Sequence, residues 1–419
     1  MKKKIICIVF LFFFWGKSEA SPIKYDDYLS NVLSGIESIK SKKSLVNAAE
    51  RDYSGSVLYA VPKVSASLTP KKNRSEDYSE GKLTVSSLLI DDTIHNAIKE
   101  KYYKLLSSKI DLNTEKERII SSIMKDVITI SLYENLRSEA LKLKEESESL
   151  YNKINTKFSF GIIKESDVQL GSLLVQKINT EIDNIENEIE RLKINIEMSA
   201  LQSYPVNGIH IEKEKINALI NYTDINNLYN NLELKNIMMK KNAAKESALQ
   251  QNSLFSISAV AENKWRNTET VREDSYIGLK ISLNIFDIES NLAESSGLER
   301  FRSLSWDYEE RYKFLMHQVK LINLTSEANV RELNNIEGQS QTTAELIKNQ
   351  EREYGINQTS VYEMLNTRYD YFQLEKAITE IKISQASNKM DLLKANGQVI
   401  YFFMSGYDET EIHKNNSTL

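Results

Sequence analysis

The chain has 419 residues with only 13 Gly and 4 Pro, a combined share of about 4% where about 12% is typical. So few turn-forming residues exclude a β-sandwich or a doubly wound α/β fold and favour a small number of very long elements. An apolar share of 41% and a charged share of 27% exclude a disordered chain and a polytopic helical membrane protein. The net charge of −5 gives no reason to expect nucleic-acid binding.

The first 20 residues have the pattern of a secretory signal peptide. Lysines at 2–4 precede an apolar run at 5–15, and Ser18 and Ala20 place small residues at the two positions that determine cleavage. The run is too short to span a membrane. We therefore predict export and removal of residues 1–20. The only cysteine, Cys7, lies in this segment, so the mature chain is expected to form no disulfide.

Two related halves follow the signal peptide. Segments 83–91 (LTVSSLLID) and 279–287 (LKISLNIFD) are alike at an offset of 196 residues. The same offset pairs Gly161 with Asn357, and Gly and Asn are the residue types that best tolerate a positive φ. We infer a tandem duplication. Its expected parts are a first repeat at 21–208, a second repeat at 209–405 and a polar C-terminal tail at 406–419.

Each half shows the same predicted order of elements: a helical stretch, two strands and two long helices. The helical stretches are expected at 25–58, 92–156 and 166–202, then at 209–251, 289–352 and 361–403. The strands are expected at 62–69 and 82–90, then at 254–262 and 276–286. Apolar residues recur with heptad-like spacing from Ile178 to Ile196, which indicates coiled-coil packing. A helix of about 60 residues would be about 90 Å long.

The predicted strands alternate apolar and small polar residues over about ten positions, which is the length and pattern of a transmembrane β-strand. An ordinary hairpin packed on the helices would show the same alternation. Because four strands cannot close a barrel, the transmembrane interpretation requires a homo-oligomer. Trp265, next to a strand end, is either an aromatic anchor at a membrane interface or a loop residue.

The order of elements and three motifs resemble the TolC family of outer-membrane export ducts. The first motif is an aromatic-x-x-Gly-x5-Asp-Val turn that begins at Phe158, and the second is its counterpart beginning at Tyr354. The third is the strand ending at 283–287, which runs directly into a helix. The resemblance covers nearly the whole chain after the signal peptide.

The resemblance implies a mainly α fold with a β-barrel part. In such a fold, three chains form one 12-stranded barrel in the outer-membrane lipid, and the duplicated helices form an α-helical tunnel across the periplasm. It also implies two partners, a periplasmic adaptor (membrane fusion) protein and an inner-membrane transporter that is either an ABC or a proton-driven pump. The expected location is the cell outer membrane, extending into the periplasm.

Site residues also follow from the resemblance. Phe158, Gly161, Asp167, Tyr354 and Asn357 would shape the two turns at the periplasmic tip, where an adaptor docks. Glu363 and Asn366 would lie at the pore constriction, with Glu363 giving a ring of three carboxylates in a trimer. The family often carries two acids there, so this ring would be weaker. Each acid also has an alternative interpretation that involves no pore. Glu363 is then a solvated surface charge, and Asp167 is an acid that opposes the helix dipole.

Signals of an enzyme are absent from the sequence. The four histidines are scattered without an HExxH pattern, and no GxSxG, GxGxxG or phosphate-binding loop occurs. We therefore expect no catalytic residues, no metal site and no cofactor, and the energy for transport must come from a partner.

The predicted function is a passive outer-membrane channel of a tripartite export system. Type I protein secretion is favoured over small-molecule efflux, although no residue carries that preference. The alternative is a periplasmic coiled-coil adaptor or scaffold protein, which would also have a signal peptide and long helices. Such a protein would have no need of two similar hairpins with lipid-compatible faces.

Overall fold

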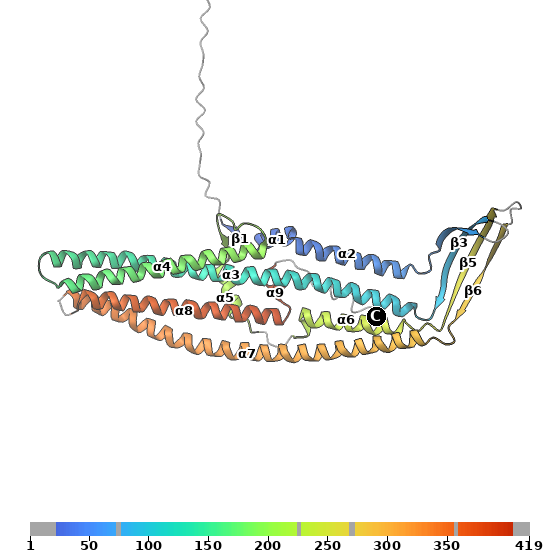
Figure 1. The fold of residues 1–419 in the computed structure, drawn as a ribbon. Coiled ribbons are helices and arrows are strands. Elements are labelled where there is room, and N and C mark those ends of the chain that lie inside the picture. The colour runs from blue at the N-terminus through green and yellow to red at the C-terminus, as the bar shows by residue number, and fades with distance from the viewer. Residues whose placement is uncertain (1–21, 73–76, 224–227, 268–272, 356–358, 405–419) are drawn as a thin grey trace, which may run out of the picture.

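The computed structural model describes residues 22–72, 77–223, 228–267, 273–355 and 359–404. Long helices run side by side and form a rod, and a sheet extends from one end of it (Figure 1). The predicted signal peptide (1–20) and C-terminal tail (406–419) lie outside the described residues.

The two halves repeat the predicted order of elements. The first half contains β1 (Ile23–Lys24), α1 (Tyr25–Gly35), α2 (Glu37–Val57), β2 (Lys63–Lys72), β3 (Asp77–Asp91), α3 (Ile94–Ser159) and α4 (Glu165–Ala200). The second contains β4 (Ile209–His210), α5 (Lys213–Ile220), the 3₁₀ helix η1 (Leu228–Asn230), α6 (Leu232–Leu249), β5 (Phe255–Asn267), β6 (Glu273–Leu283), α7 (Ile288–Gly355), α8 (Val361–Ala395) and α9 (Val399–Phe403). With 66 and 68 residues, α3 and α7 are each about 100 Å long.

Three of the predicted helical stretches are interrupted. The stretch at 25–58 divides at Ile36, whose backbone is extended and whose side chain is buried. The stretch at 209–251 is broken into α5, η1 and α6. The stretch at 361–403 divides at Gly397, where φ is +64° and a Cβ atom would lie 2.3 Å from the Asn230 carbonyl oxygen. Long-range packing therefore sets these breaks, which the local apolar pattern does not reveal.

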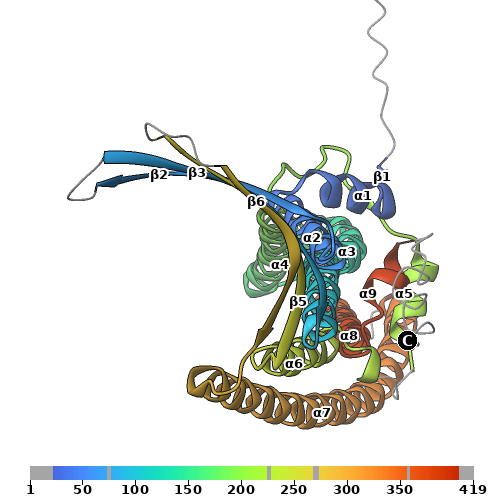
Figure 2. The ribbon, with the colours of Figure 1, turned by 90° about the vertical axis from the view of Figure 1, so that its right-hand side faces the viewer.

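The four strands form one antiparallel sheet in the order β2-β3-β5-β6. Each strand extends beyond its predicted range at the end farthest from the helices. A bulge between Leu88 and Ile90 shifts the register of β3 on β5. Within the described chain, β2 and β6 are edge strands, each with one side unpaired. Viewed along the rod, the sheet is strongly curved (Figure 2).

The core lies around α3, which packs against α2, α4, α6, α8 and α9. The six apolar residues of α4 with heptad-like spacing are all buried: Ile178, Ile182, Ile185, Ile189, Leu192 and Ile196. A short parallel pair of β1 with β4 joins the start of the first half to the start of the second. The α3–α4 and α7–α8 turns both lie at the end of the rod opposite the sheet (Figure 1).

Candidate functional site

The first tip turn closes α3 with a Schellman motif. The Gly161 N–H donates to the Phe158 carbonyl (2.8 Å), and the Ile162 N–H donates to the Lys157 carbonyl (3.0 Å). Gly161 has φ +70°, the left-handed conformation that this motif requires at the position after the cap. Phe160 and Ile162 are 74% and 67% exposed. The turn therefore presents apolar side chains to the solvent on a backbone fixed by glycine.

The second tip turn leads into α8 through a capping box. The Glu363 N–H donates to Ser360 Oγ (3.1 Å), and the Ser360 N–H donates to Glu363 Oε2 (3.0 Å). Glu363 therefore has a structural role as the third residue of α8, in addition to being exposed. Tyr354 lies in the last turn of α7. Asn357 lies outside the described residues.

An acidic stripe continues from Glu363 along α8. Asn366 donates to Asp370 Oδ2 (3.1 Å), and Glu363 and Asp370 are both exposed. The spacing of three and then four residues places all three side chains on one face of the helix. Sequence reasoning identified Glu363 and Asn366 and missed Asp370, although the i+7 spacing was visible.

Ion pairs fix α8 to its neighbours just above the tip. The Arg368 side chain is 12% exposed and pairs with Glu146 of α3 (3.3 Å) and with Glu351 of α7. Farther along, Lys376 pairs with Glu181 of α4 (2.8 Å). These contacts link residues far apart in the sequence, so no local pattern could have predicted them. Any separation of α8 from α3 at the tip must break the Arg368–Glu146 pair.

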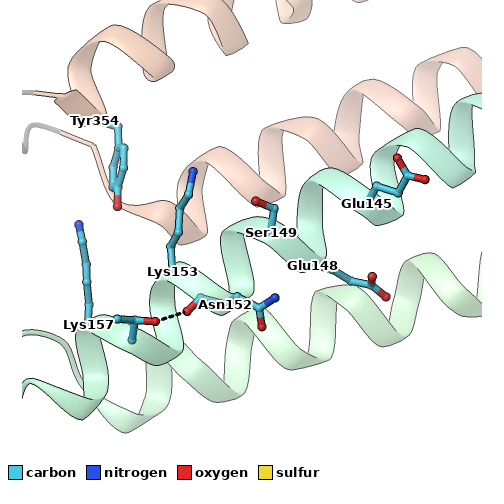
Figure 3. Close-up of a pocket in the computed structure, with 8 residues that line it drawn as sticks. Glu145, Glu148, Ser149, Asn152, Lys153, Lys157 and Tyr354 are labelled. Atoms are coloured by element: carbon cyan, nitrogen blue, oxygen red, sulfur yellow. Dashed lines mark hydrogen bonds between the residues drawn. The ribbon is translucent and has the colours of Figure 1, made fainter.

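A polar groove of about 760 Å³ runs along α3 beside the end of α7 (Figure 3). The ammonium group of Lys157 lies 4.5 Å from the centre of the Tyr354 ring, a cation–π contact that joins the two tip turns. The groove is lined by Glu145, Glu148, Ser149, Asn152, Lys153, Thr156, Lys157 and Tyr354.

At the other end of the molecule, the sheet has one apolar and one charged face. Cross-strand partners share a face, and the partners Val64, Val85, Ala261 and Ile277 lie in one row across all four strands. The same face carries many exposed side chains: Leu68, Leu83, Ile90, Phe255, Trp265, Leu279, Ile281 and Leu283. None of the helices in the described part of the chain lies over the sheet (Figure 1), so the packed-hairpin alternative does not describe it.

Trp265 lies on this apolar face rather than in a loop. Its cross-strand partner is Gly81, and a Cβ atom on Gly81 would lie 2.1 Å from the indole ring. The absence of a side chain at Gly81 therefore makes room for the indole, which is 39% exposed. Trp265 therefore lies within β5, near the end farthest from the helices, which excludes the loop interpretation, and its role as an aromatic anchor stays a prediction.

The opposite face of the sheet is polar and contains ion pairs. Glu262 pairs with Lys82 (2.6 Å) and with Lys264 (2.8 Å). Glu80 pairs with Lys71 (2.6 Å), and Arg266 lies 3.8 Å from it. The Glu262 side chain is only 4% exposed, although the face is covered by no second layer in Figure 1. Its two ion pairs with Lys82 and Lys264 account for this low exposure.

Among the described residues, no group of three or more His, Cys, Asp or Glu side chains is placed to hold a metal ion. Nor does any helix within those residues have the length and apolar character needed to cross a membrane.

Comparisons with known proteins agree with this architecture. No protein-family model matches the sequence, and a sequence search of curated proteins finds no match. Solved structures do match. The outer membrane protein VceC of Vibrio cholerae superimposes with a TM-score of 0.71 at 12% identity, over 88% of this chain and 95% of VceC. The Campylobacter jejuni CmeC outer membrane channel gives 0.68 at 15% identity, over 96% of this chain and 93% of CmeC.

The open-state MtrE outer membrane channel of Neisseria gonorrhoeae gives a TM-score of 0.69 at 12% identity, over 89% of this chain and 88% of that one. At such identities the likeness establishes the fold, and it extends over 88–96% of this chain and 88–95% of each relative. The duplicated order of elements, the sheet at one end and the paired turns at the other confirm what the motifs predicted: this chain has the fold of the TolC-family outer-membrane channels.

Proposed function

We propose that the protein is the outer-membrane channel of a tripartite export system and carries cargo from an inner-membrane transporter across the periplasm and the outer membrane. The observation that carries the proposal is the sheet, which has one uncovered apolar face and one ion-paired face at the end of a rod about 100 Å long. The fold shared with outer membrane channels supports it. No feature of the sequence suggests an enzyme.

The apolar face of β5 has the dimensions of a membrane band. Phe255 and Trp265 lie on this face at opposite ends of the strand. Ten residues extend about 33 Å, or about 25 Å across the membrane for a strand tilted by about 40°. Bands of about this height, bordered by aromatic residues, are typical of transmembrane β-barrels. In this arrangement the polar face lines the lumen.

Two features support a homotrimer. The edges β2 and β6 leave backbone groups unpaired, which a membrane does not tolerate, and three copies of four strands would close a 12-stranded barrel. The second feature is a row of exposed apolar side chains along α7, within about 80° of one another at 100° per residue. We call this row the α7 stripe: Ile288, Leu292, Trp306, Phe314, Leu321, Leu324 and Leu346. A neighbouring copy would cover it.

The tip would form the gate and the docking site of the adaptor. In a trimer, Glu363, Asn366 and Asp370 would each form a ring, so the constriction would carry two acidic rings. Breaking the Arg368–Glu146 pair would let α8 move away from α3. The exposed Phe160 and Ile162 and the groove along α3 would offer the adaptor an apolar tip beside a polar track.

The transporter that supplies energy would be an ABC or a proton-driven pump. The resemblance allows either class, and of the two cargo classes we favour secreted protein over small molecules. Crosslinking followed by identification of the co-purified transporter tests this choice, because an ABC protein supports type I secretion and a proton-driven pump supports efflux.

Cell fractionation tests the channel itself. We expect a heat-resistant trimer in the outer membrane, whereas full recovery in a periplasmic extract would support the adaptor alternative. Ile281→Arg on the apolar face should prevent insertion, because an arginine facing lipid costs about 2–4 kcal/mol. Ser282→Arg on the opposite face is the matched control and should assemble. Equal tolerance of both variants would contradict the assigned orientation of the sheet.

A further inference from the structure

Charge on the described strands is confined to one face of the sheet and is unbalanced. By the strand register, every charged residue whose side chain the structure describes lies on the polar face. Four of them are acidic: Glu80, Asp91, Glu262 and Asp274. Six are basic: Lys63, Lys71, Lys82, Lys264, Arg266 and Lys280. Each chain therefore places an excess of two positive charges on this face.

The basic side chains of this face that have no carboxylate partner among the described residues lie on the two edge strands. Glu80 and Glu262 each pair with two basic residues at the end of the sheet farthest from the helices. Lys63 and Lys280 lie nearer the helices, on β2 and β6, and are exposed. Within the described residues, neither has a carboxylate within ion-pair distance. Asp91, at the same end, accepts hydrogen bonds from the Thr93 backbone N–H (2.8 Å) and hydroxyl (2.7 Å).

Closing the sheet into a barrel would magnify this imbalance. Three chains would give an excess of six positive charges around one lumen. Because a membrane around the barrel has a low dielectric constant, fixed charges on the inner wall act on the contents of the lumen more strongly than the same charges act in open water. The tip carries charge of the opposite sign, since Glu363 and Asp370 are exposed there.

On the basis of the proposed channel function, we propose that the lumen of the barrel attracts anions. Lys63 and Lys280 then give the channel a preference for cargo that bears carboxylates. The recognised chemistry is the carboxylate, presented either by an acidic polypeptide segment or by a small organic acid. The acidic tip and the basic exit then impose opposite selectivities in series along one conduit.

Reversal potentials in planar lipid bilayers test the exit separately from the tip. The background is the double variant Glu363→Gln and Asp370→Asn, which removes the tip charges; glutamine also satisfies a capping box. In a gradient of potassium chloride, this background should be anion-selective. Adding Lys63→Glu and Lys280→Glu changes the excess from two positive to two negative charges per chain and should reverse the selectivity.

A charge swap is the matched control. Lys82→Glu combined with Glu262→Lys alters two residues of the same face without altering its net charge, so the selectivity of the background should persist. An unselective or cation-selective background, or one that Lys63→Glu and Lys280→Glu leave unchanged, would overturn the proposal. Failure to form any channel would instead contradict the proposed function.

Two further probes identify the carboxylate source. If L-glutamate replaces chloride as the current carrier while decaglutamate added on the sheet side leaves the current uninterrupted, small organic acids are favoured. If decaglutamate interrupts the current at concentrations where decalysine does not, acidic polypeptide is favoured. Interruption by decalysine at lower concentration than decaglutamate would overturn the preference for anions.

Discussion

The long helices α3 and α7 occupy equivalent places in the two repeats, yet they are buried very differently. Each follows the second strand of its half and ends at a tip turn. α3 packs against α2, α4, α6 and α8, whereas α7 packs mainly against α6 and α8. Most of the buried apolar residues of the pair therefore belong to α3, and α7 contributes Leu315, Val319 and Ile322.

Residues related by the offset of 196 show how the sequence produces this difference. Ile119 and Ile123 of α3 correspond to Leu315 and Val319 of α7, and all four are buried. On another face, Lys125 of α3 corresponds to Leu321 of α7, which is 62% exposed. At these positions the two halves have similar core-facing residues, and the second half also has an outward apolar residue. An outward apolar face is what an edge helix needs if a neighbouring chain packs against it.

The largest predicted effect is the difference in unfolding free energy between a substitution in the core of α3 and one in the α7 stripe. Ile123→Ala should lower the free energy of unfolding by about 2–5 kcal/mol, because a fully buried side chain leaves a cavity. Leu321→Ala, in a detergent that dissociates oligomers, should change it by less than about 0.5 kcal/mol. In a mild detergent, light scattering should show that Leu321→Ala weakens the trimer. Denaturant unfolding followed by circular dichroism measures the first two values.

Gln341→Ala is the control for this comparison, because Gln341 is exposed on α7 and lies about 140° around the helix from the middle of the α7 stripe at 100° per residue. This substitution should alter neither the free energy of unfolding nor the stability of the trimer. If Leu321→Ala destabilised the dissociated chain as much as Ile123→Ala, the stripe would be part of the core of one chain and the difference between the two helices would disappear.

A second effect, of about 3 kcal/mol, concerns a buried acid that α3 has and α7 lacks. Burial raises the pKa of Glu117 to about 7, against a hydrogen bond from the Val399 backbone and the nearby charge of Lys394. Glu117 keeps its proton to a higher pH in the folded state than in the unfolded state. The free energy of unfolding is therefore greatest below about pH 4.5 and falls as the pH rises to about 7. The equivalent residue in α7 is the exposed Lys313.

Glu117→Gln should remove about 3 kcal/mol of this pH dependence, measured as the unfolding free energy between pH 4.5 and pH 7. Burial also raises the pKa of Asp126, to about 6. The Glu117→Gln variant should therefore still show a smaller fall of the unfolding free energy with pH, which Asp126→Asn would remove. If the unfolding free energy of the Glu117→Gln variant depended on pH as strongly as that of the unaltered protein, the buried carboxyl of α3 would not distinguish the two helices.

Local patterns were sufficient to predict the order of elements, the approximate strands and the buried face of α4. They were not sufficient for the outer ends of the strands. There, charged residues such as Lys71 and Glu80 interrupt the apolar alternation and are stabilised by pairing with each other across the strands. The helix break at Gly397 was missed for a related reason, since it depends on the carbonyl of Asn230 from a distant segment.

At the candidate site, the two turns and Glu363 could be predicted because turn and family motifs are local. The bridge from Arg368 to Glu146 joins helices from opposite halves, so only the fold reveals it. The capping box of Ser360 and Glu363 is different: a Ser-x-x-Glu pattern before an apolar run was visible in the sequence. The two interpretations of Glu363 from the sequence, a pore residue and a solvated charge, do not include this capping role.

The smallest predicted effect concerns the helices that follow α3 and α7. The offset pairs Asp167 with Glu363, and both are the third residue of their helix, but the N-cap residue of α4 is Lys164, which supplies no side-chain cap. Ser360→Ala should therefore cost about 1 kcal/mol, and Lys164→Ser should gain about 0.5–1 kcal/mol. Hydrogen exchange of the first-turn amides, followed by mass spectrometry, should show lost protection in α8 and increased protection in α4.

Glu363→Gln then separates the two roles of this residue. Glutamine also serves at the third position of a capping box, so the protection of the first turn of α8 should be retained. The removed negative charge should lower the cation preference of the channel if Glu363 lies at the constriction. Loss of protection with unchanged ion selectivity would reduce Glu363 to a capping residue, and the two tip turns would then differ in helix stability alone.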